Sequence, residues 1–176
     1  GGAIFTNDSK MANIYKSIRV HGQGKDKYDN VRIGLNSRLD TLQAVILLNK
    51  LNFFDKELLK RNQIADYFSE NLKNFLKVPF IEKNNKSSWA QYSLVVKRIE
   101  DRDKLVNYLN KEGIPTAIFY NRIFSDLNLY NNLNLNMEFP VSSYISKSIF
   151  SIPMHPYLTQ NEQDKIINII KAYFSL

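Results

Sequence analysis

Four polar side chains mark the start of an otherwise apolar segment at residues 34–51, and their types suit the binding of an anion. They are Asn36, Arg38, Asp40 and Gln43. The amino terminus of a helix presents free N–H groups and a partial positive charge, an arrangement that binds phosphate. With Asn36 just before a predicted helix and Arg38 in its first turn, the pattern is compatible with a phosphate site. Local capping by Asn36 and Ser37, with Arg38 paired to Asp40, explains the spacing at least as well.

Other chemistries find little support in the residue types. The chain has no cysteine, which excludes disulfides, thiolate catalysis and thiolate metal sites. Its two histidines, His21 and His155, lack a metal-ligand spacing, so no zinc site is expected. No nucleophile elbow, P-loop or dinucleotide-binding glycine motif occurs. The residues alone predict an α/β domain with a polar helix entrance.

Composition predicts a folded protein without a membrane span. Hydrophobic residues make up 44% of the 176, and no apolar run approaches the roughly 20 residues that cross a bilayer. The net charge of +7 suits an anionic partner, although solvated lysines explain it too, because no run of five like charges exists. The lack of cysteine fits a cytoplasmic location. The opening GGAIFTNDSKMA has no signal-peptide pattern and reads like the middle of a longer protein.

The polar residues stand at the start of the longest predicted helix, residues 37–75. Ser37 and Asp40 resemble a capping box, and the helix carries an apolar stripe interrupted only by Arg61. The first turns, LQAVILL at residues 42–48, are apolar nearly all round. We therefore expect them to be buried in a core or in a subunit interface.

Shorter elements surround this helix and give the chain its α/β class. Strands are expected at residues 3–7, 87–97 and 114–120. Further helices are expected at residues 9–20, 100–113 and 160–174, and residues 144–153 should form a short helix followed by a strand. Thr159 and Glu162 form a capping box for the last helix. The strand–helix–strand unit at residues 87–120 is the centre of a small α/β subdomain.

Several blocks, in this order, resemble the DegT/DnrJ/EryC1/StrS family of aminotransferases. The most specific are GLNSRLDTLQAVILLNKL, which is similar to the family's G-x-N-x-R block, and RDKLVNYLNKEGIPTAIFY, which is similar to its G-I-x-T block. IRVHG, RNQIADYF, SSWAQYSLVV and SIPMHPYLTQNEQDKII resemble further family motifs. The resemblance covers essentially the whole chain.

The resemblance implies a fold and a domain division. The chain is similar to the carboxy-terminal part of a fold type I transferase that depends on pyridoxal 5′-phosphate (PLP), with a long linking helix and a small α/β subdomain. Residues 1–36 would end the large PLP-binding domain, 37–75 would form the interdomain or interface helix, and 76–176 the small domain. Family members are homodimers with the active site at the interface.

The resemblance also implies a reaction. Such enzymes transfer an amino group from Glu or Gln to a nucleotide-linked keto sugar, for surface polysaccharide, glycan or antibiotic sugar biosynthesis. The lysine that binds PLP covalently would lie before Gly1, so this chain alone is expected to be inactive, and Lys10 is not assigned that role. A PLP-dependent sugar dehydratase of the same family and a non-catalytic regulatory fragment are the alternatives. Neither nucleic acid nor a membrane is an expected partner.

The site residues implied by the resemblance fall into two groups. Asn36 and Arg38 would bind the cofactor, with Asn36 reaching the PLP phosphate of the partner subunit. The residues expected near the substrate are Arg19, His21, Gly22 and Tyr120. After Tyr120 the chain departs from the family's Y-Y-P-x-P-L-H pattern, because both prolines and the histidine are lost. The acceptor sugar is therefore unusual, or the loop has drifted.

Overall fold

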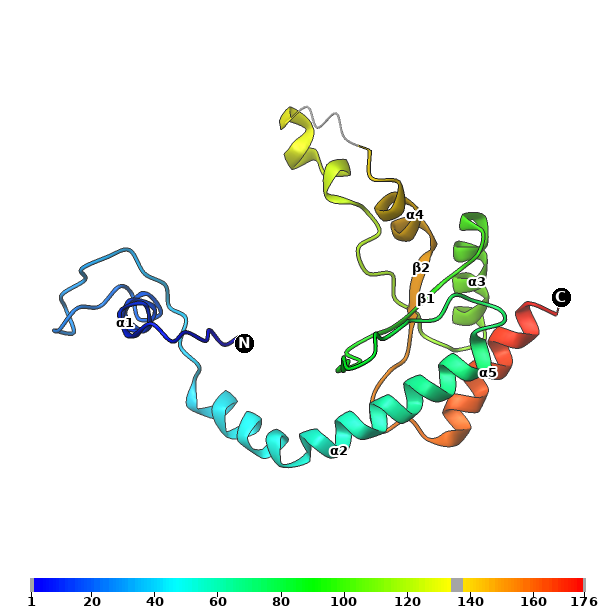
Figure 1. Ribbon diagram of the computed structural model, residues 1–176, viewed down its shortest axis with the longest axis horizontal. Coiled ribbons are helices and arrows are strands. Elements are labelled where there is room, and N and C mark those ends of the chain that lie inside the picture. Colours follow the sequence, from blue (N-terminus) through cyan, green and yellow to red (C-terminus); the bar gives the residue numbers. More distant parts are fainter. Residues whose placement is uncertain (1, 134–137, 176) are drawn as a thin grey trace. The chain divides into compact units, whose positions relative to one another are not determined.

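The computed structural model describes residues 2–133 and 138–175, which fall into two compact units (Figure 1). Unit 1 is Gly1–Phe53 and unit 2 is Phe54–Leu176. Within the described residues, no helix is both long and apolar enough to cross a bilayer. The structure has the mixed helix-and-sheet content expected for an α/β fold. The division into domains at residues 36 and 75 stays a prediction.

Unit 1 contains α1 (Ser9–Ile18), which begins where a side chain caps it. The Asp8 carboxylate accepts hydrogen bonds from the backbone N–H groups of Lys10 (2.8 Å) and Met11 (3.2 Å). The helix ends two residues before the predicted end, because Val20 pairs with Asn36 in an isolated β-bridge. The predicted strand at residues 3–7 is wrong. That segment has no strand partner in the described residues, and a strand without a partner leaves its backbone groups unpaired.

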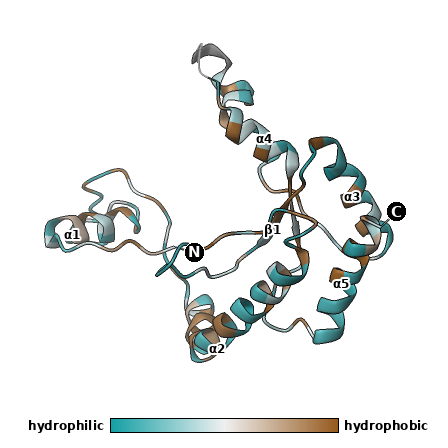
Figure 2. Ribbon diagram, turned by 45° about the vertical axis from the view of Figure 1, so that its right-hand side comes forward, coloured by the Kyte–Doolittle hydropathy of each residue, from teal (hydrophilic) through white to brown (hydrophobic). Residues whose placement is uncertain are grey.

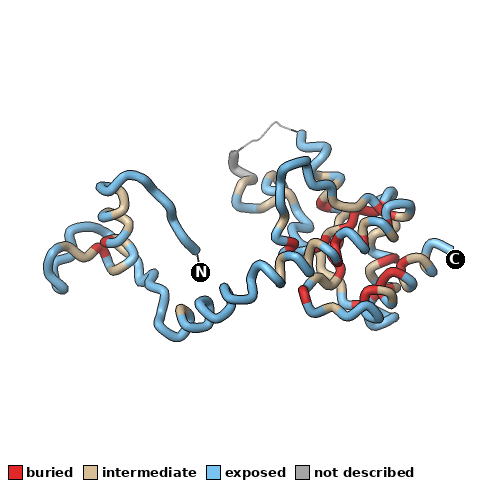
Figure 3. Tube along the Cα trace, turned by 60° about the horizontal axis from the view of Figure 1, so that its bottom comes forward, coloured by how far each residue is buried: buried red, intermediate tan, exposed pale blue. Residues whose placement is uncertain are grey.

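The long helix α2 (Thr41–Leu72) changes character along its length. Its later turns are buried in unit 2 through Ile64, Ala65, Phe68 and Leu72. Its first turns are exposed (Figure 3), although they are rich in hydrophobic residues (Figure 2). We name residues 42–54 the exposed apolar segment. Its large hydrophobic side chains are 49–73% exposed: Leu42, Val45, Ile46, Leu47, Leu48, Leu51, Phe53 and Phe54. The prediction that residues 42–48 lie in the core is therefore wrong for this chain, and a subunit interface remains the other prediction.

Unit 2 is built on an antiparallel pair of strands, β1 (Tyr92–Val95) and β2 (Ile149–Ile152), in which Tyr92 faces Ile152. Single bridges extend the pair on both sides. Lys77 bridges Val95, and Ala117 bridges Ser151. The strand predicted at residues 114–120 is thus reduced to the one bridge at Ala117. In the described residues, the segment pairs with a strand only at Ala117, whose N–H donates to the Ser151 carbonyl at 3.0 Å and whose carbonyl accepts from the Ser151 N–H at 2.7 Å.

Helices and short turns complete unit 2. They are α3 (Ile99–Lys111), the 3₁₀ turns η1 (Phe124–Asp126) and η2 (Asn128–Leu133), α4 (Pro140–Ser148) and α5 (Gln160–Tyr173). Two local predictions are confirmed. The α3 helix has acidic residues in its first turn and is followed by Gly113 at a φ of +76°. The α5 helix begins with the predicted capping box of Thr159 and Glu162.

The core of unit 2 lies between the two strands, the end of α2, and helices α3 and α5 (Figure 3). Its fully buried large side chains include Phe68, Leu72, Tyr92, Leu94, Leu105, Phe150 and Ile170. Polar groups at its edge are paired. The Arg61 guanidinium, which interrupts the apolar stripe of α2, donates to the carbonyls of Trp89 (2.9 Å) and Met154 (3.3 Å). Within the described residues, every buried side-chain nitrogen and oxygen has a partner.

Candidate functional site

The residues with the strongest predicted roles lie on a hydrogen-bonded segment of unit 1, residues 19–37, which we name the bridged loop. An antiparallel bridge sets Asn36 opposite Val20. Next to it, the backbone N–H of Ser37 donates to the carbonyl of Arg19 at 3.0 Å. Residues 16 positions apart in the sequence are thereby neighbours. The backbone brings Arg19 and Asn36, which were predicted separately, to one place.

His21 and Gly22 turn the chain near the beginning of the bridged loop. Both have a left-handed backbone, with φ of +57° and +74°, a conformation that glycine adopts freely and histidine adopts more often than most residues. The His21 N–H donates to the Leu35 carbonyl (2.9 Å), and the Gly22 N–H donates to the Ser17 carbonyl (2.9 Å). The Asn30 amide closes the turn by donating to the His21 carbonyl at 2.8 Å. The RVHG motif is therefore a defined turn.

The bridged loop and the segment after it present side chains that suit an anion. Arg19, Arg32 and Arg38 form no ion pair with any residue that the structure describes, and the Asn36 amide has no hydrogen-bond partner there. Arg19, Asn36 and Arg38 are exposed. Guanidinium and amide groups donate hydrogen bonds, and guanidinium matches phosphate and carboxylate oxygens in pairs. This donor set fits a phosphate group.

The start of α2 differs from both interpretations of the sequence, the phosphate site at the helix terminus and the local cap formed by Asn36 and Ser37. Asp40 is the capping residue, because its carboxylate accepts from the Gln43 N–H at 2.9 Å and α2 begins at Thr41. Asn36 therefore does not lie at the helix terminus, Arg38 does not lie in the first turn, and the Ser37–Asp40 capping box is wrong. The Ser37 N–H is already bonded to a distant carbonyl, which holds this segment outside the helix. Any anion bound here would be held by side chains and loop backbone.

Tyr120, the remaining predicted site residue, belongs to unit 2. It follows the bridge at Ala117 and precedes η1. Its φ is +57° and it is 87% exposed. A left-handed backbone is costly for a tyrosine, and such conformations concentrate at functional sites. The structure brings Arg19, His21, Gly22 and Asn36 together in unit 1, with Arg38 two residues further along the chain. Tyr120 belongs to the other unit.

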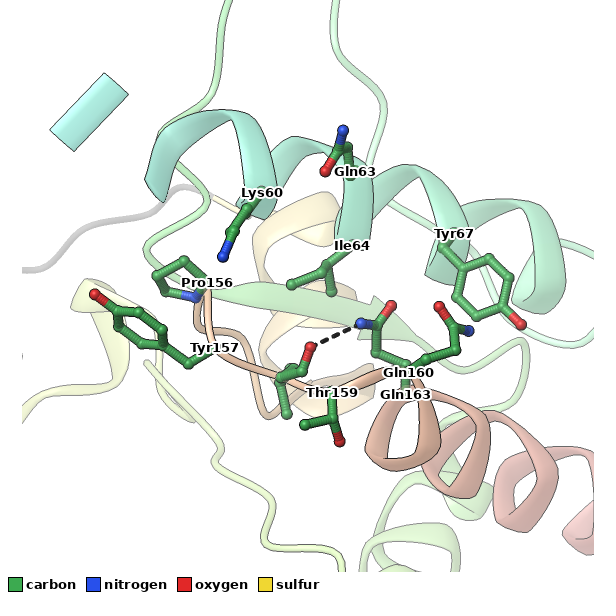
Figure 4. A pocket seen from close by; sticks show the side chains of 10 residues that line it. Lys60, Gln63, Ile64, Tyr67, Pro156, Tyr157, Thr159, Gln160 and Gln163 are labelled. Carbon is green, nitrogen blue, oxygen red and sulfur yellow. Dashed lines mark hydrogen bonds between the residues drawn. The ribbon is translucent and has the colours of Figure 1, made fainter. Parts of the chain in front are cut away.

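A concave site, which the sequence did not indicate, lies within unit 2. Figure 4 shows this groove of 580 Å³ between α2 and the turn that leads into α5. Gln163 spans its floor by donating to the Leu158 carbonyl at 2.9 Å. The nearby Asp164 carboxylate accepts from the Tyr67 hydroxyl (2.7 Å) and from Gln160 (2.9 Å). The Tyr67 hydrogen bond holds the pKa of Asp164 below its usual value, and the carboxylate raises the pKa of Tyr67 in turn.

This groove was not predictable because its two walls are about a hundred residues apart and no motif joins them. Most of its polar side chains are hydrogen-bonded to neighbouring residues, and they form no recognisable catalytic arrangement. Across the two described stretches of the chain, no group of three or more His, Asp and Glu side chains could hold a metal ion. The bridged loop therefore remains the candidate functional site.

Comparison with known proteins gives sequence relatives and a shared fold. The chain is 41% identical over 160 residues to a UDP-2-acetamido-2-deoxy-3-oxo-D-glucuronate aminotransferase of Pseudomonas aeruginosa, covering 90% of this chain and 43% of that protein. It is 33% identical over 174 residues to a dTDP-3-amino-3,6-dideoxy-alpha-D-galactopyranose transaminase of Aneurinibacillus thermoaerophilus, covering 98% and 47%. The chain thus spans less than half the length of these relatives.

A solved structure and the family profile agree with these relatives. The crystal structure of a DegT DnrJ EryC1 StrS aminotransferase from Brucella abortus superposes with a TM-score of 0.87 at 42% identity, covering 96% of this chain and 45% of that one. The profile of the DegT/DnrJ/EryC1/StrS aminotransferase family matches residues 1–171. The chain belongs to the DegT/DnrJ/EryC1/StrS aminotransferase family.

Proposed function

We propose that this chain is the carboxy-terminal portion of a PLP-dependent aminotransferase that converts a nucleotide-linked keto sugar to an amino sugar. The observation that carries the proposal is the bridged loop, which places Asn36 beside Arg19 with its amide free of partners in the described structure. Membership of the family and 41% identity to a sugar aminotransferase support it. The amino donor is Glu or Gln, and the amino sugar serves a surface polysaccharide, a glycan or an antibiotic. The reaction takes place in the cytoplasm.

The donors of the bridged loop fit the phosphate of PLP. Asn36 donates from its amide, and Arg38 supplies a guanidinium two residues further along the same segment. Bound PLP supplies the electron sink that an exchange of an amino group for a ketone requires. The lysine that attaches PLP covalently is assigned to a part of the protein outside these 176 residues. This chain therefore contributes phosphate binding and orientation.

Arg19, His21, Gly22 and Tyr120 are assigned to the side of the acceptor sugar. A nucleotide-linked sugar carries a diphosphate, and an exposed guanidinium such as that of Arg19 matches it in charge and shape. Gly22 allows the turn that presents Arg19 and His21, because its φ of +74° suits glycine. The exposed ring of Tyr120 offers an apolar face with a polar end. The active protein is a homodimer, in which Asn36 serves the site of the partner subunit.

The substitution Asn36→Ala in the full-length protein tests this assignment. Loss of a hydrogen bond to a charged phosphate typically costs about 1.5–3 kcal/mol, which corresponds to a roughly 10- to 100-fold weaker PLP affinity. The affinity is measured by titrating the apoprotein with PLP and following cofactor absorbance. Asn13→Ala is the matched control, because Asn13 is exposed on α1 and has no hydrogen-bond partner in the described structure. Unchanged PLP affinity in Asn36→Ala would refute the cofactor role.

A further inference from the structure

Gly34 lies where two backbone segments of the bridged loop touch. A Cβ atom placed on Gly34 would lie 2.0 Å from the backbone nitrogen of Gly22, 2.3 Å from the carbonyl carbon of His21 and 2.7 Å from the carbonyl oxygen of Ile18. Real Cβ atoms essentially never approach other heavy atoms within 3.0 Å. All three neighbours are main-chain atoms, so no side-chain rotation can relieve the contact. Any residue larger than glycine must push the two segments apart.

Gly22 completes the contact from the other side. Its own Cβ would lie 1.7 Å from the carbonyl oxygen of Arg32, and its φ of +74° disfavours other residues. Hydrogen bonds hold it in place. Its N–H donates to Ser17 at 2.9 Å, and its carbonyl accepts from Val31 at 3.0 Å. Gly22 cannot move without breaking these two backbone hydrogen bonds.

The contact fixes the segment that carries the proposed cofactor ligands. Leu35, next to Gly34, donates its N–H to the Ile18 carbonyl at 2.7 Å and accepts from the His21 N–H at 2.9 Å. Asn36 is the next residue, and its register opposite Val20 is set by the His21–Leu35 bond together with the bond from the Ser37 N–H to the Arg19 carbonyl at 3.0 Å. A shift of one residue in such a pairing turns each side chain to the opposite face.

We propose that Gly34 is a positioning residue for cofactor binding, and that it acts through Asn36. The close backbone contact at Gly34 sets the register that aims the Asn36 amide at the phosphate. The proposal rests on the proposed function, since it needs Asn36 to bind PLP. It assigns Gly34 no contact with the cofactor.

A double-mutant cycle in the full-length protein separates positioning from general stability. We expect Gly34→Ala to weaken PLP binding about tenfold or more, as Asn36→Ala does. If Gly34 acts through Asn36, the double variant binds PLP no more weakly than Asn36→Ala alone. Additive losses of affinity in the double variant would overturn the proposal, because they would show that Gly34 acts by another route.

Gly24→Ala is the matched control within the same loop. A Cβ on Gly24 would meet the Asp29 carboxylate at 2.6 Å and a Val31 methyl at 2.8 Å, both side-chain atoms, and a main-chain atom, the Asp29 carbonyl oxygen, only at 3.1 Å. The collision with the backbone is therefore much milder than at Gly34. We expect PLP affinity to change less than threefold in this variant. An equal loss in Gly24→Ala and Gly34→Ala would overturn the proposal, because it would trace the effect to loosening of the loop in general.

A milder variant decides the matter if Gly34→Ala does not fold. Asn30→Ala removes the side-chain bond to the His21 carbonyl without creating a collision. We expect it to weaken PLP binding, though less than Asn36→Ala does, and to have no further effect in the Asn36→Ala background. An effect that persists in that background would contradict the proposal.

The outcomes separate this inference from the proposed function. If Asn36→Ala alone leaves PLP affinity unchanged, the proposed function fails. If Asn36→Ala weakens binding while Gly34→Ala and Asn30→Ala do not, only this inference fails.

Discussion

At the residue scale, the burial of Tyr92 in unit 2 makes the stability of the fold depend on pH. Its ring is fully buried against Phe68 and Trp89, and its hydroxyl shares a hydrogen bond of 2.7 Å with Ser69. Burial, which disfavours the charged phenolate, raises the pKa of Tyr92 to about 12. In the unfolded chain the same group titrates near 10. The folded state therefore keeps its proton over a range in which the unfolded state loses it.

This difference predicts alkaline destabilisation between pH 10 and pH 12. Below pH 10 Tyr92 is neutral in both states and its contribution is complete. Between the two pKa values, the free energy of unfolding falls by about 1.4 kcal/mol per pH unit, for a total of about 3 kcal/mol. Urea unfolding at a series of pH values measures the slope. Tyr92→Phe should flatten it, whereas Tyr28→Phe, an exposed control, should not. Equal slopes in wild type and Tyr92→Phe would refute the prediction.

At the element scale, the capping box of α5 predicts a measurable loss of stability. The Thr159 hydroxyl accepts from the Glu162 N–H (3.3 Å), and the Glu162 carboxylate accepts from the Thr159 N–H (2.8 Å). The helix contributes Ile166 and Ile170 to the core, so its first turn supports buried packing. Thr159→Ala should lower the free energy of unfolding by about 1 kcal/mol. Urea titration at neutral pH checks this value.

Thr159→Ser is the control for this cap, because it keeps the hydroxyl and should retain most of the stability. The hydrogen bonds from Thr159, first from its backbone and then from its side chain, lower the pKa of Glu162. The box is therefore complete above the ordinary carboxyl pKa and weakens as the pH falls through the lowered one. The difference between wild type and Thr159→Ala should shrink in acid. If the difference in the free energy of unfolding stayed constant down to low pH, the Glu162 carboxylate would not contribute to the cap.

The two helix starts show which features a sequence can reveal. The capping box of α5 depends on two residues three positions apart, so the sequence pattern of a capping box was enough to predict it. The start of α2 depends on the Ser37 N–H bonding to the carbonyl of Arg19, 18 residues away, and no local rule contains that contact. The same distant pairing brings Arg19 to Asn36. The family motifs therefore indicated which residues matter, while their juxtaposition needed the structure.

At the scale of the whole molecule, the exposed apolar segment is the main feature that this chain leaves unexplained. Eight large hydrophobic side chains between residues 42 and 54 are each at least 49% exposed. Large hydrophobic side chains exposed in such number along one helical segment are typical of an interaction site. The chain spans less than half of its sugar aminotransferase relatives, so other parts of the protein or a second subunit have room to cover it. The proposed homodimer makes part of this segment a subunit interface.

The homodimer predicts that charge in this segment separates the subunits. In the full-length protein, Leu48→Glu with Leu51→Glu should shift the sedimentation behaviour from dimer to monomer, because two carboxylates would be desolvated in an apolar interface. Both leucines are 64% exposed in this chain, so the substitutions should leave the folding of unit 2 intact. Asn52→Glu, at an exposed polar position of the same segment, is the control and should stay dimeric. PLP affinity should fall together with dimerisation, because Asn36 is assigned to the partner's cofactor. If the monomer kept full PLP affinity, the assignment of Asn36 to the partner's cofactor would be wrong. Asn36 would then bind the cofactor of its own subunit.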